Sequence, residues 1–132
     1  MVRLTDRAFR VYYVYVPEVG KEKYVVAVAP YGSQWYCFLI NSDLPLFLQQ
    51  LTACHFIVPR AQHPFLSHDS YLTTNRAFPL HTNTLNCHVG NLHSSCQEKL
   101  YEAIRDCPSL GRETKHLMVE YLTSHAQHCC TE

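Results

Sequence analysis

The chain has 132 residues, of which 47% are hydrophobic and 17% are charged. This length suits a single domain with its own core, here taken as residues 1–132, and the composition excludes an intrinsically disordered chain. Basic and acidic residues number 11 each, so the zero net charge argues against a strongly basic protein that coats nucleic acid. A local cationic patch for nucleic acid remains compatible with this balance.

The seven cysteines are an odd number, and the opening residues "MVRLTDRAFR" lack the apolar core of a signal peptide. We therefore expect a cytoplasmic protein with reduced thiols and no intramolecular disulfide. No apolar run approaches the roughly 20 residues that a membrane-spanning helix needs, so no membrane contact is expected.

The first half of the chain has the pattern of β-strands. Valine and aromatic residues are concentrated in three runs bounded by proline, glycine or asparagine, at residues 9–16, 23–29 and 35–41. Gly20 lies between the first two runs, which predicts a hairpin there. These three runs predict the start of an antiparallel sheet.

The middle of the chain is less regular. Residues 54–59 and 70–74 predict two more strands, and the segment before residue 54 fits either a short helix or a loop. Pro79 interrupts the polar stretch that follows residue 74, which predicts a turn and at most one weak strand.

The pattern becomes helical near residue 94. Apolar residues recur at helical spacing in one set, Cys96, Leu100, Ala103, Ile104 and Cys107. This set predicts a helix at about 95–107, with Ser94 or Ser95 as its N-cap, a capping box to Glu98, and an end at Pro108. A second helix is expected from about Gly111 to Ser124, followed by a frayed tail at 125–132.

Strands followed by helices predict a mainly β fold. We expect a small barrel or curled sheet over about residues 9–90, with C-terminal helices at about 94–124 packed against it.

The segment "HPFLSHDSY", residues 63–71, is the first candidate site. His68 is of a residue type that can act as general acid and base near neutral pH. Asp69 follows it directly, and on a strand the two side chains would point to opposite faces. The alternative is structural: a turn whose polar residues, Asp69 and Ser70 among them, bind backbone amides while its apolar residues fill the core.

Arg60 and His63 flank the same segment. An arginine beside a histidine can stabilise a pentacoordinate phosphate while the histidine moves a proton. The alternative is a solvated arginine that follows the break at Pro59.

Three further polar residues are candidates for a cleft. Ser42 follows the third predicted strand, where it either lines a cleft or opens a turn. Lys21 and Lys23 lie in the first hairpin among many tyrosines, and aromatic rings with nearby lysines can bind unpaired bases. The alternative is that these rings are half-buried residues of the sheet.

The C-terminal tail holds four residues of metal-ligand type, His125, His128, Cys129 and Cys130. A His-x-x-His pair on a helix can bind zinc, so a zinc-stabilised regulator is a third interpretation. Adjacent cysteines rarely bind one ion together, and no CxxC pair precedes them, so we expect no metal.

The order of the segments resembles that of the MazF/PemK-like family of toxin ribonucleases. The chain reads "YVVAV…FLINS", then "HPFLSHDSYL", then "HVGNL" leading into an amphipathic helix. Asp69-Ser70-Tyr71-Leu72 matches a short strand of the family, and Val89-Gly90-Asn91-Leu92 matches its turn before the long helix. The resemblance covers nearly the whole chain.

The resemblance implies an SH3-like barrel with C-terminal helices that cleaves single-stranded RNA without metal or cofactor. It gives Ser42 the place of the family's threonine or serine. The family's arginine near the first hairpin is absent, and Lys21 and Lys23 stand there without the bidentate fork of arginine. This departure makes His63, His68 and Arg60 the candidates for catalysis, with Asp69 and Ser70 supporting them.

The resemblance also implies an inhibiting antitoxin protein and a homodimer as partners. The alternative is a non-catalytic interaction or regulatory module on the same barrel, which binds a protein or peptide in a groove between strands. The missing arginine favours this alternative, whereas the clustered histidines favour the enzyme.

Overall fold

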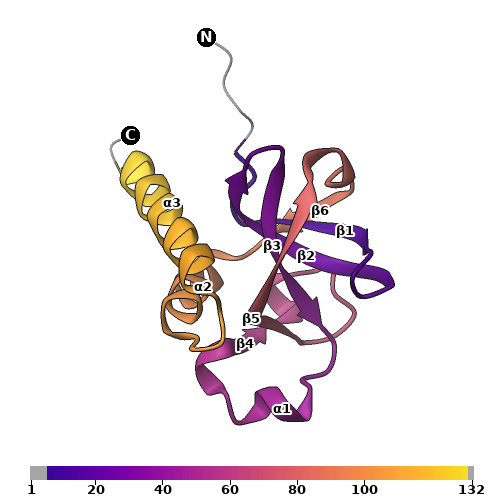
Figure 1. Cartoon of the computed structure of the whole chain (residues 1–132). Helices are drawn as coiled ribbons and strands as arrows, with labels where there is room; N and C mark the ends of the chain where they lie inside the picture. The colour runs from indigo at the N-terminus through magenta and orange to yellow at the C-terminus, as the bar shows by residue number, and fades with distance from the viewer. Residues whose placement is uncertain (1–5, 131–132) are drawn as a thin grey trace.

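The computed structural model describes residues 6–130, and from residue 125 onward it describes the backbone alone. Figure 1 shows a strongly bent sheet with the C-terminal helices beside it. The strands are β1 (Arg10–Val16), β2 (Lys21–Tyr31), β3 (Gln34–Asn41), β4 (His55–Val58), β5 (Ser70–His81) and β6 (His88–Asn91). The helices are α1 (Leu46–Gln49), α2 (Ser94–Asp106) and α3 (Arg112–Cys130), with 3-10 turns η1 (Thr52–Cys54), η2 (Arg60–Gln62) and η3 (Thr82–Thr84).

The six strands form one antiparallel sheet in the order β4-β5-β3-β2-β1-β6. Gly20 and Gly32 adopt positive φ angles, of 83° and 62°, in the turns that join β1 to β2 and β2 to β3. The mainly β class with C-terminal helices is confirmed. Within the described residues the end strands β4 and β6 do not pair with each other, so the sheet is open.

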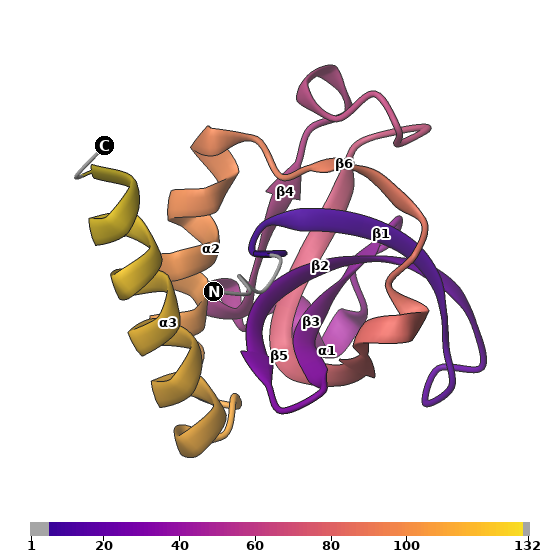
Figure 2. The same ribbon diagram turned by 90° about the horizontal axis from the view of Figure 1, so that it is seen from above.

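Both faces of the sheet carry a core, because successive side chains of a strand point to opposite faces. Val26 belongs to the cluster that packs against α2 and α3, whereas its neighbour Val25 belongs to the second cluster. The second cluster joins residues of β1, β2, β3 and β5, such as Tyr12 and Phe78, which the curvature of the sheet brings together. Figure 2 shows α2 and α3 side by side along one side of the sheet.

The prediction that the fifth strand ends near residue 74 is wrong. β5 continues to His81, and Pro79 lies in it opposite Tyr36 of β3. β4 pairs only with residues 70–73, so the later half of β5 has a partner on one side alone. Proline is tolerated at such an edge because its missing N–H removes no ladder hydrogen bond on the free side. β6, which pairs with β1, was likewise not predicted as a strand.

The helices are close to their predicted bounds, but their ends differ. The N-cap of α2 is His93, whose Nδ1 accepts the N–H of Ser95 at 3.1 Å, so the predicted serine caps are wrong. An imidazole nitrogen here replaces the usual side-chain oxygen as the acceptor of an otherwise unpaired amide. α3 runs to Cys130, so its backbone is helical over 125–130, where fraying was expected.

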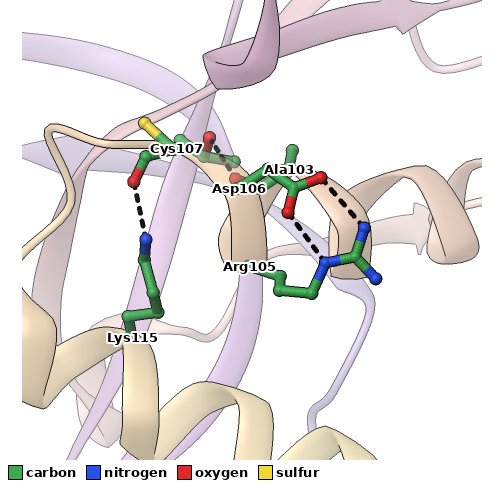
Figure 3. Close-up of polar contacts among 6 residues, drawn as sticks. Ala103, Arg105, Asp106, Cys107 and Lys115 are labelled. Atoms are coloured by element: carbon green, nitrogen blue, oxygen red, sulfur yellow. Dashed lines mark hydrogen bonds and ion pairs between the residues drawn. The ribbon is translucent and has the colours of Figure 1, made fainter.

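The prediction of no intramolecular disulfide is also wrong. Cys54 of η1 and Cys107 at the end of α2 form one, with 4.8 Å between their Cα atoms. Figure 3 shows the anchoring of Cys107, whose N–H donates to Ala103 O and whose carbonyl accepts from Lys115 Nζ of α3 at 2.8 Å. An odd number of cysteines requires only that at least one thiol stays unpaired. Whether two of the other cysteines form a disulfide depends on how close the fold brings them.

No helix of the described chain is long and apolar enough to span a membrane.

Candidate functional site

A cleft of about 170 Å³ lies at the end of the sheet where β2 begins and β3 ends. Its far wall is the loop between η2 and β5. Four of the side chains that were predicted as site residues line it: Lys23, Ser42, His68 and Ser70. They come from three separate segments of the chain, so the fold brings together residues up to 47 positions apart in sequence.

The loop that carries His68 is held by hydrogen bonds to its own backbone. Asp69 Oδ1 accepts the N–H of Arg60 at 2.8 Å, and Arg60 Nε donates to Leu66 O at 3.1 Å. Ser70 Oγ donates to His68 O at 3.1 Å. Asp69 thus binds a backbone amide as the structural alternative predicted, whereas Ser70 binds a carbonyl instead of the predicted amide. Together these bonds fix the loop that presents His68 to the cleft.

The aromatic residue Phe65 anchors the same loop to the sheet. Its carbonyl accepts a hydrogen bond from Tyr24 Oη at 3.1 Å, and its ring lies against Gly90 of β6. A Cβ atom at Gly90 would lie 2.8 Å from Phe65 Cδ2, so only glycine allows this approach. The segments "HPFLSHDSYL" and "HVGNL" therefore contact each other in space through Phe65 and Gly90.

His68 is exposed on the cleft wall, and its ring is near a hydroxyl group. Its Nδ1 lies 3.1 Å from Ser67 Oγ. The carboxylate of Asp69 is used at Arg60, so Ser67 and not Asp69 contacts the imidazole. His68 thus keeps Nε2 for a ligand while Nδ1 is held.

His63 lies outside the cleft and is fully buried. Its Nδ1 donates to Pro59 O at 2.7 Å, and its Nε2 accepts the backbone N–H of His93 at 3.0 Å. Both ring nitrogens are therefore used within the fold, which favours a structural role for this neutral imidazole. The structure does not bring His63 to His68, although five positions separate them in sequence.

Arg60 does not line the cleft either. Its guanidinium group binds the carbonyl of Leu66, and its backbone N–H binds Asp69, so both groups serve the loop. The predicted pairing of an arginine and a histidine around one phosphate is thus absent from the geometry of these described residues.

Lys23 is the cation of the cleft. Its Nζ donates to Asn41 Oδ1 at 2.8 Å, which orients the ammonium group toward the end of β3. Partial burial lowers the pKa of Lys23, and the positive charge of Lys21 lowers it further. Lys21 is exposed and does not line the cleft.

Three cleft residues that the sequence analysis did not single out are Glu22, Tyr13 and Ser67. Glu22 adds a carboxylate to the lining of the cleft. Tyr13 pairs with Tyr24 across β1 and β2, with 4.8 Å between the ring centroids. The register of the first hairpin would have indicated this tyrosine pair, but no signal in the sequence placed Glu22 or Ser67 at the cleft.

The cleft combines one cation, two groups able to exchange a proton, and several hydroxyl groups. Within residues 6–124, no three histidine, cysteine or acidic side chains are arranged to hold a metal ion. The predicted metal-ligand residues His125, His128, Cys129 and Cys130 have side chains outside the described part. The set in the cleft suits an anionic ligand such as a phosphodiester.

No protein-family model matches the sequence, and no curated protein matches it.

Proposed function

We propose that the protein binds single-stranded RNA at this cleft and cleaves it without a metal ion. The observation that carries the proposal is the convergence of Lys23, His68 and Ser42 from three segments on one cleft. Lysine neutralises a phosphate, histidine exchanges protons near neutral pH, and serine hydroxyls donate hydrogen bonds to phosphate oxygens.

The chemistry is attack of a ribose 2′-oxygen on the adjacent phosphorus. The O2′–P bond forms and the P–O5′ bond breaks, which leaves a 2′,3′-cyclic phosphate and a 5′-hydroxyl. The 2′-hydroxyl proton goes to a base, and an acid gives a proton to the leaving O5′. In this proposal the Glu22 carboxylate is the base and the His68 imidazolium is the acid.

The remaining cleft residues have supporting parts. Lys23 neutralises the negative charge that builds up on the phosphate in the transition state. Ser42 donates to a phosphate oxygen. Ser70 is a positioning residue, because its hydroxyl already donates to the carbonyl of His68.

The resemblance to the MazF/PemK-like family enters the proposal as a supporting argument. An SH3-like barrel is part of it, supported by the curvature that joins β1 and β5 in one core. A toxin held in check by an antitoxin, a homodimer and a cytoplasmic location belong to the same proposal. The lysines in place of the family's arginine weigh against it, and so does the Cys54–Cys107 disulfide, since disulfides are rare in the cytosol.

The test is incubation of the purified protein with several single-stranded RNAs in the presence of a chelator. We expect products that end in a 2′,3′-cyclic phosphate, identified by mass spectrometry. Intact RNA on every substrate, with any co-purified protein removed, would overturn the enzymatic proposal.

A second candidate is the non-catalytic interaction module. The hydrogen bond between Lys23 and Asn41 favours it, because an ammonium group that is already bonded in the free protein is less available to a transition state. Under this candidate the protein binds a protein or peptide and leaves RNA intact.

A further inference from the structure

A second and larger depression adjoins the cleft. It encloses about 710 Å³ between the β1–β2 hairpin and the segment from Pro79 to Cys87. Tyr13 and Glu22 line both depressions, so the two share a wall. The larger depression, which we call the hairpin groove, is therefore a neighbour of the cleft that an extended ligand can reach across this wall.

The hairpin groove offers exposed aromatic surface. The relative exposure of Tyr15 is 57% and that of Tyr13 is 40%, both far above what a core residue shows. Tyr13 packs against Tyr24, whereas no aromatic ring within the described residues packs against Tyr15. An exposed ring of this kind is a platform on which an unpaired base can stack.

The hairpin groove is acidic, whereas the cleft also contains the cation Lys23. Glu18 and Glu22 line the groove, and within the described chain neither lysine nor arginine does. Glu18 is paired with Arg76, but Glu22 has no ion-pair partner among residues 6–130. The two acidic side chains repel a phosphate from this groove, whereas a neutral base is not repelled.

Polar groups that can bind base edges complete the wall. Asn83, Thr84 and Asn86 line the groove with amide and hydroxyl groups. His81 is held in place, because its Nδ1 accepts the N–H of Asn83 at 3.1 Å. This wall is therefore ordered before a ligand arrives, and its groups both donate and accept.

We propose that the hairpin groove is the subsite for an unpaired base whose adjoining phosphate lies in the cleft. The base stacks on Tyr15, and its polar edge forms hydrogen bonds with the side chains of Asn83 and Asn86. This inference rests on the proposed function only in that it places the phosphate in the cleft. It names the ligand class as single-stranded nucleic acid with an accessible base, and it excludes double-stranded RNA, whose bases are stacked inside the helix.

The test uses a fluorescein-labelled 2′-O-methyl octanucleotide, which cannot be cleaved because its 2′-oxygens are blocked. Fluorescence anisotropy gives the Kd at fixed salt. Loss of base stacking in Tyr15→Ala should weaken binding roughly 5-fold to 150-fold, whereas Tyr15→Phe should keep most of the affinity. Tyr31→Ala is the matched control, because Tyr31 is 56% exposed and lies outside both depressions. Its affinity should equal that of the wild type.

A second measurement locates the base without any substitution. Cys87 lines the hairpin groove and is an exposed free thiol, whereas Cys37 and Cys96 are buried and burial raises their pKa values. The octanucleotide should slow alkylation of Cys87, followed by peptide mass spectrometry. An octamer of abasic sugar-phosphate units should not protect it.

The outcomes separate this subsite from the proposed function. Binding that depends on Lys23 but not on Tyr15, with Cys87 unprotected, overturns the subsite and leaves the cleft standing. Binding that depends on Tyr15 in a protein that cleaves no RNA supports the subsite and overturns the enzymatic proposal. A wild-type protein that binds no octanucleotide overturns both.

Discussion

The backbone N–H of His93 donates a hydrogen bond of 3.0 Å to Nε2 of His63, which lies 30 residues earlier in the chain. His93 is itself the N-cap of α2, and His63 is fixed from its other side by the carbonyl of Pro59. One buried imidazole thus joins the loop at the cleft to the start of the first long helix. The position of that helix and the shape of the cleft are coupled through it.

His63→Leu should therefore destabilise the fold rather than remove a catalytic group. It leaves a buried carbonyl and a buried N–H without partners, which should lower the free energy of unfolding by about 2–4 kcal/mol. Chemical denaturation followed by tryptophan fluorescence measures this. An unchanged midpoint together with lost activity would instead assign His63 to catalysis.

His68→Gln should abolish most cleavage without unfolding the protein. Glutamine keeps a hydrogen-bonding group but cannot titrate, so the cleavage rate should fall roughly 100-fold to 10,000-fold while RNA binding stays near that of the wild type. The control is His116→Gln, because His116 is exposed on α3 and pairs with Glu120. Chelator-resistant cleavage that survives His68→Gln would remove His68 from the mechanism.

As the pH rises, RNA binding should begin to weaken at a lower pH than it would if Lys23 had the pKa of an ordinary lysine. The pKa of Lys23 is lowered, so its positive charge is lost as the pH rises through that lowered value, and the attraction to phosphate is lost with it. Lys23→Arg should hold binding to higher pH, since arginine stays charged. Lys21→Gln should move the loss of binding to a higher pH than in the wild type, because the positive charge of Lys21 no longer lowers the pKa of Lys23. Identical profiles for all three proteins would contradict the assignment of Lys23.

Gly90→Ala should disturb the cleft from a distance. The new Cβ would lie 2.8 Å from the ring of Phe65, which must move and take the loop with it. Overpacking of this kind should lower stability by about 1–3 kcal/mol. Adding Phe65→Leu should recover part of the loss. Gly111→Ala is the matched control, since nothing lies within 4 Å of its added Cβ. Equal effects at both glycines would show that the contact with Phe65 is unimportant.

Loss of the Cys54–Cys107 disulfide should lower the free energy of unfolding markedly. The sequence separation of 53 corresponds to about 4 kcal/mol in the chain-entropy description. The double substitution Cys54→Ala and Cys107→Ala, compared with wild type with and without reductant, measures it. Alkylation of the unfolded, unreduced protein should leave both residues unmodified; their modification would contradict the disulfide.

The strands of the first half were predictable because their periodicity and glycine turns are local properties. The later half of β5 was not, since Pro79 is tolerated there only because β4 is too short to reach it. The cap of α2 was missed for a similar reason. His93 is held by a residue far away in sequence, and local preferences favoured the serines that follow it.

The candidate site was predictable in part. The segment "HPFLSHDSY" does carry a cleft residue, His68, and the hairpin lysine Lys23 lines the same cleft. Sequence spacing could not distinguish His63 from His68, because the 3-10 turn and the loop after it turn one ring inward and leave the other exposed. That difference depends on tertiary contacts with Pro59 and His93.

The disulfide also closes part of the chain into a covalent ring, with one segment before the ring and another, which contains α3, after it. Residues 54–107 form a closed ring, and the strands β1, β2 and β3 precede it as an open arm. Lys23 and Ser42 belong to the arm, whereas His68 and Ser70 belong to the ring. The arm docks onto the ring where β3 pairs with β5 and where β1 pairs with β6. Neither part holds the complete set of cleft residues, so the cleft forms only when arm and ring have docked.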